Sequence, residues 1–451
     1  MKVLVIVRHV LFLRFLEPVI EQLLAVGHEV EVGYTAGMAD EYAKKLMERP
    51  WARNAVISVA PLDKGWMYRG LLFLRLAQDY LRYLDPVYDA SPGLRYRAAT
   101  PIPRPIRQIF RLFGARFAVF RWGLIRLLRW LDQSLPCNPA VNRYLGCRAF
   151  DILLITPLVD PTSGECEYLK CAINRGGKSV LMVASWDNLT NKGLVQFEPD
   201  RILVWNRWVA REAMTLHRLP ENKIRIVGAP VFDTWFSMHP SCVREELIAR
   251  LGLDSGWPII LYLCSSGFIA SHEIDSIMDW LKGLRSHPDD LVRNAGVLIR
   301  PHPGNPQDWT RLSAFENIAV CPPNGEQVLD EVARARYFDS MYYAKAIVAI
   351  NTSGMIEAGI VGRPVLMLSD MRTHVSQEGT LHFRLLVENG LIQPVTSEGE
   401  HFKRLADYLS GQDPELEARG RFIGDFVHPH GWNVSAAKIV VNELEDLDRS
   451  C

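Results

Sequence analysis

The sequence lacks the cysteine patterns that mark a metal-binding or disulfide-stapled domain. It has no Cys-x-x-Cys pair, and its eight cysteines are scattered without zinc-finger spacing to histidine, at 137, 147, 166, 171, 242, 264, 321 and 451. Scattered cysteines in a chain of 451 residues indicate reduced thiols of the cytosol rather than a secreted scaffold. We therefore expect neither a zinc-finger site nor a disulfide framework.

Long hydrophobic runs are also missing. No predominantly apolar stretch reaches the roughly 20 residues that a membrane span needs. The N-terminal run Val3–Val7 is followed at once by Arg8 and His9, which fits a first strand better than a signal peptide. These features predict a cytoplasmic protein.

Three common nucleotide and hydrolase motifs are absent. Without GxxxxGK[ST] the chain is not a P-loop NTPase, and without GxGxxG after its first strand a nicotinamide-dependent dehydrogenase is disfavoured. The absence of a GxSxG elbow disfavours an α/β-hydrolase. The formal net charge of +0 argues against general nucleic-acid binding.

What is present is a repeated strand–helix alternation with a large apolar content of 48%, enough for two or three domains with sizeable cores. Strands alternating with helical segments predict parallel, doubly wound sheets. The first series of expected strands is 3–7, 29–34, 55–59, 151–155, 179–184, 201–205 and 224–227. The second series is 259–263, 297–300, 317–321, 346–350 and 365–368.

The two series predict two Rossmann-like domains. We expect an N-terminal domain over 1–235, with a helical insertion at about 65–147, and a C-terminal domain over 236–432. The segment 433–451 is predicted to be a C-terminal helix.

The insertion is strongly basic. Residues 65–135 hold twelve arginines against four aspartates, with neither lysine nor glutamate. Over Arg107–Leu131 a single helical phase places most arginines on one arc and phenylalanines and leucines on the opposite arc. Two interpretations remain open: the apolar stripe packs on the N-terminal sheet beneath solvated arginines, or residues 105–131 lie on an anionic membrane surface.

The most informative stretch is Ile347–Leu368, which contains a strand, the turn Asn351-Thr352-Ser353-Gly354, a short helix with Glu357, and a second strand. Small residues at a turn present backbone N–H groups to an anion. Glu357 follows one helical turn later, where it can accept hydrogen bonds from sugar hydroxyls. This layout indicates a nucleotide-type ligand at the carboxyl edge of a parallel sheet.

The stretch resembles the C-terminal-domain signature of GT-B glycosyltransferases and their relatives, the teichoic-acid glycerophosphotransferases and the sugar-nucleotide epimerases. A second segment, Arg300-Pro301-His302-Pro303, resembles the Arg-x-His-Pro motif of glycerophosphotransferases and capsule-type sugar transferases. The resemblance implies an α/β fold of two Rossmann-like domains facing a cleft. It implies an N-terminal domain on the acceptor side, a C-terminal domain that binds the donor, and a last helix, within 433–451, that crosses back to the N-terminal domain. It also implies that the donor-binding residues are Ser265, Ser266, Gly267, Arg300, His302, Thr352, Ser353, Gly354 and Glu357.

Two residues are candidates for the catalytic base. His9 follows the first strand, and Asp187 follows the strand 179–184, so both fall at the carboxyl edge of the first sheet. Alternatively, His9 caps a helix and Asp187 forms an Asx-type turn. Further acceptor-side or secondary candidates are Arg8, Arg14, Trp186, Asn188, Lys192, His374 and His382.

The combined interpretation is a metal-independent glycosyltransferase that moves a sugar from a nucleotide-activated donor to a glycan or lipid-linked hydroxyl in cell-envelope polysaccharide synthesis. No cofactor, metal or nucleic acid is expected. The alternatives are a sugar-nucleotide 2-epimerase, a polyol-phosphate transferase, and a non-catalytic membrane- or glycan-binding protein. Whether the protein also sits peripherally on the inner face of the membrane is left open.

Overall fold

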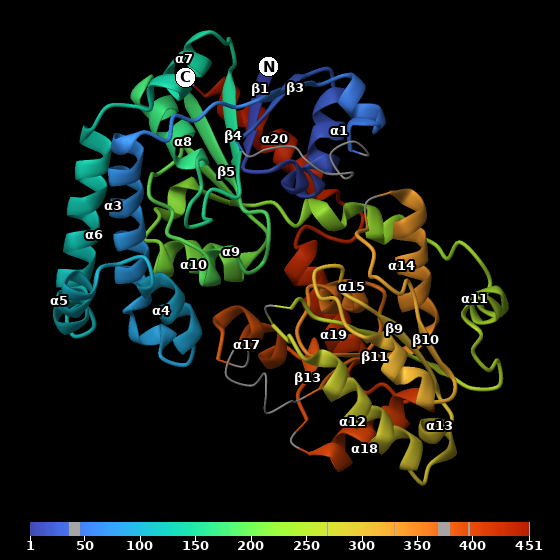
Figure 1. Ribbon diagram of the computed structural model, residues 1–451. Helices are drawn as coiled ribbons and strands as arrows, with labels where there is room; N and C mark the ends of the chain where they lie inside the picture. Colours follow the sequence, from blue (N-terminus) through green and yellow to red (C-terminus); the bar gives the residue numbers. More distant parts are fainter. Residues whose placement is uncertain (36–45, 268, 329, 369–378, 396, 451) are drawn as a thin grey trace. The chain divides into compact units, whose positions relative to one another are not determined.

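The structure is a computed structural model that describes residues 1–35, 46–267, 269–328, 330–368, 379–395 and 397–450. It divides into two compact units, each built around its own parallel sheet (Figure 1). Unit 1 comprises Met1–Asp233, Thr380–His382 and Asp425–Cys451, and unit 2 comprises Thr234–Gly379 and Phe383–Gly424. This confirms the predicted α/β class with two doubly wound sheets.

The sheet of unit 1 has seven strands among the described residues, in the order β3-β2-β1-β4-β5-β6-β7. Their bounds are β1 (Lys2–Val7), β2 (Glu29–Tyr34), β3 (Val56–Val59), β4 (Ile152–Thr156), β5 (Lys178–Met182), β6 (Arg201–Val204) and β7 (Ile224–Ile226). The central strand β1 pairs with both β2 and β4, and its residues Val3–Val7 are all buried. A strand covered on both faces needs an unbroken apolar run, and β1 has one.

The sheet of unit 2 repeats the same order over six described strands, β10-β9-β8-β11-β12-β13. Their bounds are β8 (Ile259–Leu263), β9 (Gly296–Arg300), β10 (Ile318–Val320), β11 (Ala344–Ala349), β12 (Val365–Met367) and β13 (Ile392–Gln393). The two-residue strand β13 was not predicted, because two residues are too short to show a period.

Helices cover these sheets. Those that begin before residue 234 are η1 (Val10–Phe15), α1 (Glu17–Ala25), η2 (Pro50–Arg53), α3 (Trp66–Tyr83), η3 (Pro86–Tyr88), α4 (Pro92–Ala99), α5 (Arg104–Gly114), α6 (Ala118–Ser134), α7 (Pro139–Gly146), α8 (Glu165–Asn174), α9 (Asn188–Asn191), α10 (Arg207–Leu216), η4 (Glu221–Lys223) and η5 (Pro230–Ser237). The later ones are α11 (Arg244–Leu251), α12 (Glu273–Ser286), α13 (Asp290–Arg293), η6 (Trp309–Ala314), α14 (Glu331–Tyr343), α15 (Gly354–Ile360), α17 (Leu381–Glu388), α18 (Glu398–Leu409), α19 (Leu416–Val427) and α20 (Ala436–Arg449). Among the described residues, none of these helices has the length and apolarity to cross a bilayer.

The C-terminal helix α20 packs on unit 1. Ser435 caps its N-terminus, and Asp233 accepts hydrogen bonds from the first two helical amides, at 3.0 and 2.9 Å. Further along, Glu443 receives the guanidinium of Arg201 at 2.7 Å. The chain therefore returns to the first sheet after the second one is complete.

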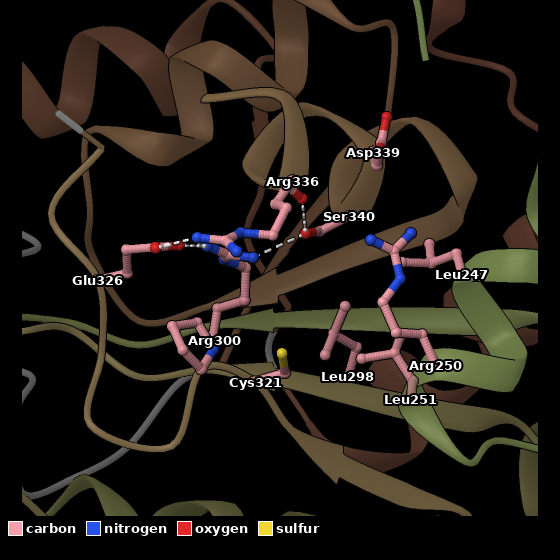
Figure 2. Close-up of a pocket in the computed structure, with 11 residues that line it drawn as sticks. Leu247, Arg250, Leu251, Leu298, Arg300, Cys321, Glu326, Arg336, Asp339 and Ser340 are labelled. Atoms are coloured by element: carbon pink, nitrogen blue, oxygen red, sulfur yellow. Dashed lines mark hydrogen bonds and ion pairs between the residues drawn. The ribbon is translucent and has the colours of Figure 1, made fainter. Parts of the chain in front are cut away.

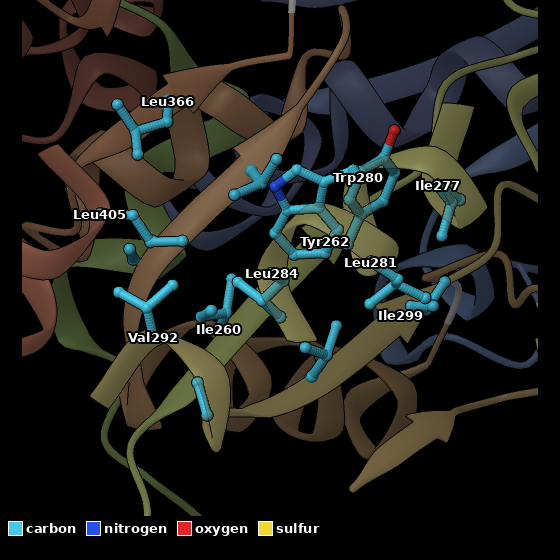
Figure 3. Close-up of a cluster of buried hydrophobic side chains, with 14 of the residues drawn as sticks. Ile260, Tyr262, Ile277, Trp280, Leu281, Leu284, Val292, Ile299, Leu366 and Leu405 are labelled. Carbon is cyan, nitrogen blue, oxygen red and sulfur yellow. The ribbon is translucent and has the colours of Figure 1, made fainter. Parts of the chain in front are cut away.

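In the core of unit 2, the face of the sheet formed by β9, β8, β11 and β12 is covered by α12, α13 and α18 (Figure 3). Tyr262 of β8 lies beside Trp280 of α12, with ring centroids 5.8 Å apart, and both are buried. The indole N–H of Trp280 donates to Nε2 of His401 on α18 at 3.0 Å. The same hydrogen bond therefore ties two covering helices together.

The helical insertion between β3 and β4 corrects one prediction. The continuous helical phase expected over Arg107–Leu131 is wrong, because the chain leaves the helix after Gly114 and restarts at Ala118. The break changes the rotational phase, so Arg121 turns inward and binds the carbonyl of Gly114, while Phe120 and Leu127 are exposed. At the break, Gly114 packs closely against Leu84, because a Cβ added to Gly114 would lie only 3.0 Å from the Leu84 side chain.

Within the insertion, the inner side of α6 packs on α3 rather than on the sheet. Tyr80, Leu81 and Ile125 form a buried cluster there, and Leu194 from the segment after α9 is part of it. The insertion thus has its own small core, separate from that of the sheet.

Candidate functional site

Three loops of unit 2 converge at the carboxyl edge of its sheet. They follow β9, β8 and β11, which are neighbours in the sheet, so Arg300, Ser265 and Asn351 lie at adjacent strand ends. Parallel strands place their carboxyl ends at one edge, where ligands of such sheets bind. The predicted donor-binding residues in these three loops therefore share one edge.

Ser265 connects the loops. Its backbone N–H donates to Glu273 at 2.8 and 3.0 Å, its carbonyl accepts from the amide of Asn305 at 3.0 Å, and its hydroxyl accepts from the N–H of Asn351 at 3.2 Å. Ser265 is fully buried, whereas Ser266 and Gly267 are partly exposed. Ser265 therefore shapes the loops, and its two successors present the exposed backbone.

Burial raises the pKa of Glu273 to about 8, against the hydrogen bonds from Ser265. Burial and the hydrogen bonds from the Ser265 N–H thus act in opposite directions on this carboxyl, which anchors the loop after β8.

Arg300, Tyr337 and Glu357 form a chain across the same edge. The guanidinium of Arg300 lies 5.0 Å from the ring centroid of Tyr337, and the Tyr337 hydroxyl donates to Glu357 Oε2 at 2.9 Å. Burial lowers the pKa of Arg300, while Tyr337 and Glu326 act in the opposite direction, and the group remains a cation because arginine does not deprotonate at physiological pH. The arrangement fixes a cation and a carboxylate on either side of one aromatic ring.

His302 follows Arg300 in a turn that determines its tautomer. The N–H of Gly304 donates to Nδ1 of His302 at 3.0 Å. A neutral ring that accepts at Nδ1 carries its proton on Nε2, so that nitrogen is a donor. His302 therefore has the tautomer needed to donate to a phosphate oxygen.

Thr352 and Ser353 lie in the turn before α15, and Gly354 is the first residue of that helix. The Thr352 hydroxyl accepts from the N–H of Gly354 at 3.4 Å, and Ser353 is exposed. A Cβ on Gly354 would lie 2.7 Å from the Tyr337 hydroxyl, so this position requires the closest approach that only glycine permits.

A pocket of about 220 Å³ adjoins this edge (Figure 2). Arg300 donates to Ser340 at 2.9 Å within it, while Arg336 pairs with Glu326. Its apolar wall includes Leu247 and Leu298. Because ligand pockets usually exceed about 300 Å³, this one is too small for a whole nucleotide sugar and holds at most part of one.

The carboxyl edge of the unit 1 sheet carries a second polar group. Arg8 binds Asp160 at 2.8 Å and donates to the hydroxyl of Thr162 at 3.0 Å, and Lys192 lies 3.5 Å from the other oxygen of Asp160. Each of these three charged side chains is about one-third exposed or less. Arg8 and Lys192, which are both predicted site residues, therefore share the carboxylate of Asp160, which the sequence did not indicate.

His9 caps the first turn after β1. Its Nδ1 accepts from the N–H of Leu11 at 3.2 Å, so the neutral ring carries a proton on Nε2. In this arrangement His9 is a hydrogen-bond donor, and acting as a base would require it to leave the cap. Arg14 lies at 4.6 Å from the ring of Phe15 and is exposed.

Asp187 is surrounded by donors. Its carboxylate accepts from Ser185 and Asn191, both at 2.7 Å. Burial raises the pKa of Asp187, but His382, Lys192 and these hydrogen bonds outweigh it, so the pKa lies below its ordinary value. Such a carboxylate stays ionised and is a weak base.

The neighbours of Asp187 are enclosed. Trp186 is 7% exposed and Asn188 is 5% exposed, and the Asn188 side chain accepts from the N–H of Ser185 at 3.1 Å. His382 belongs to unit 1, where its Nδ1 lies 3.0 Å from the Thr190 hydroxyl and its ring 4.9 Å from that of Trp186. Burial lowers the pKa of His382 to about 4. His374 lies outside the described residues.

The helical insertion holds the loop that carries these residues. From α3, Arg82 donates to the carbonyl of Leu189 at 2.8 Å and also to that of Lys192, and Tyr83 donates to the Lys192 carbonyl at 2.6 Å. His217 donates through Nε2 to Leu189 at 2.7 Å, because its Nδ1 accepts from Val195 at 3.0 Å. We call this group, Arg82, Tyr83 and His217, the loop clamp.

Sequence reasoning missed several of these residues. No recognised motif contains Asp160, Asn305 or Tyr337. Their only sequence indication is their position: Asp160 follows β4, Asn305 follows β9, and Tyr337 precedes β11. Arg82 was seen only as one charge among twelve in the insertion. In the described part of the chain, no three His, Cys, Asp or Glu side chains are grouped so that they could hold a metal ion.

No family model and no curated protein matches this chain. Solved structures are similar over its whole length: the UDP-GlcNAc 2-epimerase of Neisseria meningitidis bound to UDP-GlcNAc has 13% identity and a TM-score of 0.58, covering 99% of this chain and 100% of that one. The UDP-GlcNAc 2-epimerase of Methanocaldococcus jannaschii has 12% identity and a TM-score of 0.54, with 99% and 100% covered. A glycosyltransferase of Rickettsia africae ESF-5 has 11% identity and a TM-score of 0.55, with 100% and 99% covered. At these identities the likeness concerns the fold, and this chain has the GT-B fold.

Proposed function

We propose that the protein is a sugar-nucleotide enzyme, and specifically a glycosyltransferase that moves a sugar from a nucleotide-activated donor to a hydroxyl acceptor. The observation that carries the proposal is the arrangement at the carboxyl edge of unit 2. There, a buried cation, a histidine with its donor on Nε2, a glycine-dependent turn and a carboxylate lie on adjacent strand ends. Similar folds include one solved with UDP-GlcNAc bound, which supports a nucleotide-sugar ligand.

In this proposal the donor diphosphate binds beside Arg300 and His302. A guanidinium can hold two phosphate oxygens at once, and the N–H at Nε2 of His302 donates to the charge that grows on the leaving group. The exposed backbone of Ser266 and Gly267 and the turn Thr352-Ser353-Gly354 offer further N–H donors. Glu357 accepts hydrogen bonds from sugar hydroxyls of the nucleotide.

The acceptor hydroxyl must lose a proton, and His9 and Asp187 are the proposed bases. Each has a hydrogen-bonded role in the described arrangement, so each would act only after a local change. The proposal needs no cofactor other than the nucleotide-activated sugar itself. The acceptor is proposed to be a glycan or lipid-linked hydroxyl at an anionic membrane surface.

Thermal unfolding with UDP-, GDP-, CDP- and CMP-type ligands tests the donor site. We expect one class to raise the midpoint, since a ligand present at 100 times its Kd stabilises by about 2.7 kcal/mol. Arg300→Ala and His302→Ala should each abolish most of the rise. The control is Arg293→Ala, because Arg293 ends α13 and lies outside these loops, and it should leave the rise unchanged. A rise that survives both loop variants rules out the proposed donor site.

An epimerase is the second candidate, because several solved proteins of this fold are titled UDP-GlcNAc 2-epimerases. Incubation with UDP-GlcNAc separates the two functions. Isomerised sugar nucleotide without any acceptor supports the epimerase, and free UDP that appears only with an acceptor supports the transferase. A polyol-phosphate transferase would instead release a nucleoside monophosphate.

A non-catalytic binding protein is the remaining alternative. It predicts that Arg300→Ala and His302→Ala leave function in cells intact. For an enzyme, losing one preorganised donor to the leaving group should reduce kcat about 10²- to 10³-fold.

A further inference from the structure

Helices α5 and α6 have an outer face that the rest of unit 1 does not cover. Their inner sides face α3, where Ile125 is buried and Arg121 is held by the Gly114 carbonyl and Asp85 (Figure 1). Large apolar side chains on the other side are strongly exposed: Val119 is 88% exposed and Trp130 is 62% exposed. We call this side the α5–α6 face.

The exposed apolar side chains are concentrated on this face. Its members share an exposed fraction of 39% or more and are Ile109, Leu112, Phe113, Phe117, Val119, Phe120, Leu127, Trp130, Leu131 and Leu135. On α6, five of them fall within one arc of the helix at ~100° per residue, which makes a continuous stripe. The rings of Phe113 and Phe120 lie 5.5 Å apart, so the stripes of the two helices join.

Positive charge borders the stripe. Arg104, Arg111, Arg116 and Arg126 are exposed, and within the described chain no hydrogen bond or ion pair is found for these four side chains. Asp132 is the only acidic residue between 104 and 135, and it is fully buried between Arg75 and Lys170. The face is thus apolar at its centre, basic at its margin and free of exposed acidic groups.

We propose that the α5–α6 face docks on an anionic lipid bilayer. An amphipathic helix with large apolar side chains on one face and arginines beside them lies in the plane of the lipid interface, and anionic headgroups pair with the arginines. A second copy of the chain fits less well, because a self-complementary contact would oppose the arginines of one copy to those of the other. A nucleic acid would leave the aliphatic side chains Leu112, Val119 and Leu127 without a partner.

The surface also has a structural connection to the loop clamp. Helix α6 packs on α3, and α3 carries Arg82 and Tyr83, which bind the loop with Asp187 and Lys192. The use of this surface in presenting a lipid-linked acceptor rests on the proposed function. The docking itself does not, and it is measured without any sugar nucleotide.

The test is co-sedimentation of the full chain with vesicles. Vesicles of equal parts phosphatidylcholine and phosphatidylglycerol are compared with vesicles of phosphatidylcholine alone, at low and at high salt. We expect binding to the anionic vesicles that weakens as salt screens the arginines. Binding to neither vesicle, or equal binding to both, overturns the proposal.

Two sets of variants locate the binding surface. The charge variant combines Arg104→Gln, Arg111→Gln, Arg116→Gln and Arg126→Gln, and at about fivefold per arginine it should weaken binding by at least about a hundredfold. Its control makes the same substitution at four exposed arginines elsewhere, Arg53, Arg211, Arg384 and Arg421, and should bind like the wild type. Equal losses in both sets would assign the binding to general charge and overturn the proposal.

The apolar part is tested by fluorescence. Bromine-labelled lipid should quench the tryptophan emission of the wild type, and Trp130→Phe should remove part of that quenching, while Trp432→Phe should not. Light scattering on the free protein provides the remaining check. A dimer that Phe117→Ser dissociates, together with no vesicle binding, would assign the face to a second copy instead.

Discussion

The two sheets have the same strand order, but the connection between their third and fourth strands differs greatly. In unit 1 this connection, from β3 to β4, contains the five helices α3 to α7, whereas in unit 2 the connection from β10 to β11 has one described helix, α14. Both connections perform a similar task. Arg82 and Tyr83 of α3 bind the loop after β5, and Tyr337 and Ser340 of α14 bind Arg300 at the end of β9.

In each unit, side chains of the crossover between the third and fourth strands hold the candidate site residues in place. The long crossover uses arginine against backbone carbonyls, and the short one uses a tyrosine and a serine against an arginine. The longer crossover of unit 1 also carries the α5–α6 face, which the loop clamp does not require.

The largest expected effect comes from breaking the attachment of the long crossover. Asp132 on α6 accepts from Arg75 at 2.7 and 3.0 Å and from Lys170 at 3.1 Å, and all three side chains are fully buried. Asp132→Asn removes the carboxylate shared by the buried cations Arg75 and Lys170. The remaining acidic partner is Glu167, which lies 2.7 Å from Arg75. We expect a loss of about 3–5 kcal/mol in the free energy of unfolding of unit 1, measured by urea denaturation.

The matched control for that experiment is Asp425→Asn. Asp425 pairs with Arg207 in solvent, both more than half exposed, so its loss should cost no more than about 1 kcal/mol. Equal destabilisation by the two substitutions would show that the buried group does not anchor the crossover.

The short crossover is tested through Gly354→Ala. The added Cβ would lie 2.7 Å from the Tyr337 hydroxyl, which is held by Glu357, so the contact must be relieved by moving the site. We expect a cost of about 1–3 kcal/mol and a smaller nucleotide-induced rise in the unfolding temperature. Gly420→Ala, within α19 and with open space around it, should instead stabilise the protein by about 0.5–1 kcal/mol.

The pH dependence sharpens the comparison, because the clamp of unit 1 includes a buried histidine. Burial and the charge of Arg82 lower the pKa of His217 well below its usual value. The unfolded chain then binds the proton first, so the contribution of His217 is complete above pH 6.5 and decreases as the pH falls below it. The slope is about 1.4 kcal/mol per pH unit.

The measurement is the denaturation midpoint of the wild type and of His217→Gln between pH 7 and pH 5. The variant should be less stable at pH 7 and should show a flatter pH dependence. The quantity to compare is the difference in stability between the wild type and the variant at each pH. Burial also raises the pKa of Asp79 to about 7, so protonation of Asp79 stabilises both proteins as the pH falls and cancels in this difference. Parallel curves would contradict the assignment.

The smallest effects come from removing one hydroxyl from each crossover. Tyr83→Phe removes a hydrogen bond to Lys192, and Tyr337→Phe removes one to Glu357. Each should cost about 1 kcal/mol in stability. Tyr337→Phe should reduce the nucleotide-induced thermal shift, and Tyr83→Phe should leave that shift unchanged. Identical ligand responses would contradict the proposed placement of the nucleotide in unit 2.

The strand positions were largely predictable from the sequence. Buried parallel strands appear as apolar runs, and those at 29–34 and 259–263 match the structure to the residue. The boundary segments at 351–354 and 300–302 were also found, since turns at the carboxyl ends of such strands have a recognisable composition. Whether these residues bind a donor stays a prediction.

The helical insertion was predictable in composition but not in phase. A three-residue interruption after Gly114 changes the rotational phase of α6 relative to α5. No single residue in Ala115–Phe117 is a typical helix breaker, so the sequence does not predict the interruption. Hydrogen bonds from side chains to distant carbonyls were equally hidden. The link between Arg82 and Lys192 spans 110 residues of sequence, and periodicity carries no information over that separation.

Leu194 shows that the insertion is not a detachable appendage. This residue belongs to the segment between β5 and β6, yet its side chain is enclosed by Tyr80, Leu81 and Ile125 from the insertion, and its N–H donates to Asp79 at 2.6 Å. Excising the insertion would therefore strip an apolar side chain and a backbone amide of their surroundings inside unit 1. A variant of this chain with a shorter crossover would therefore need a different residue at position 194, one that tolerates contact with water.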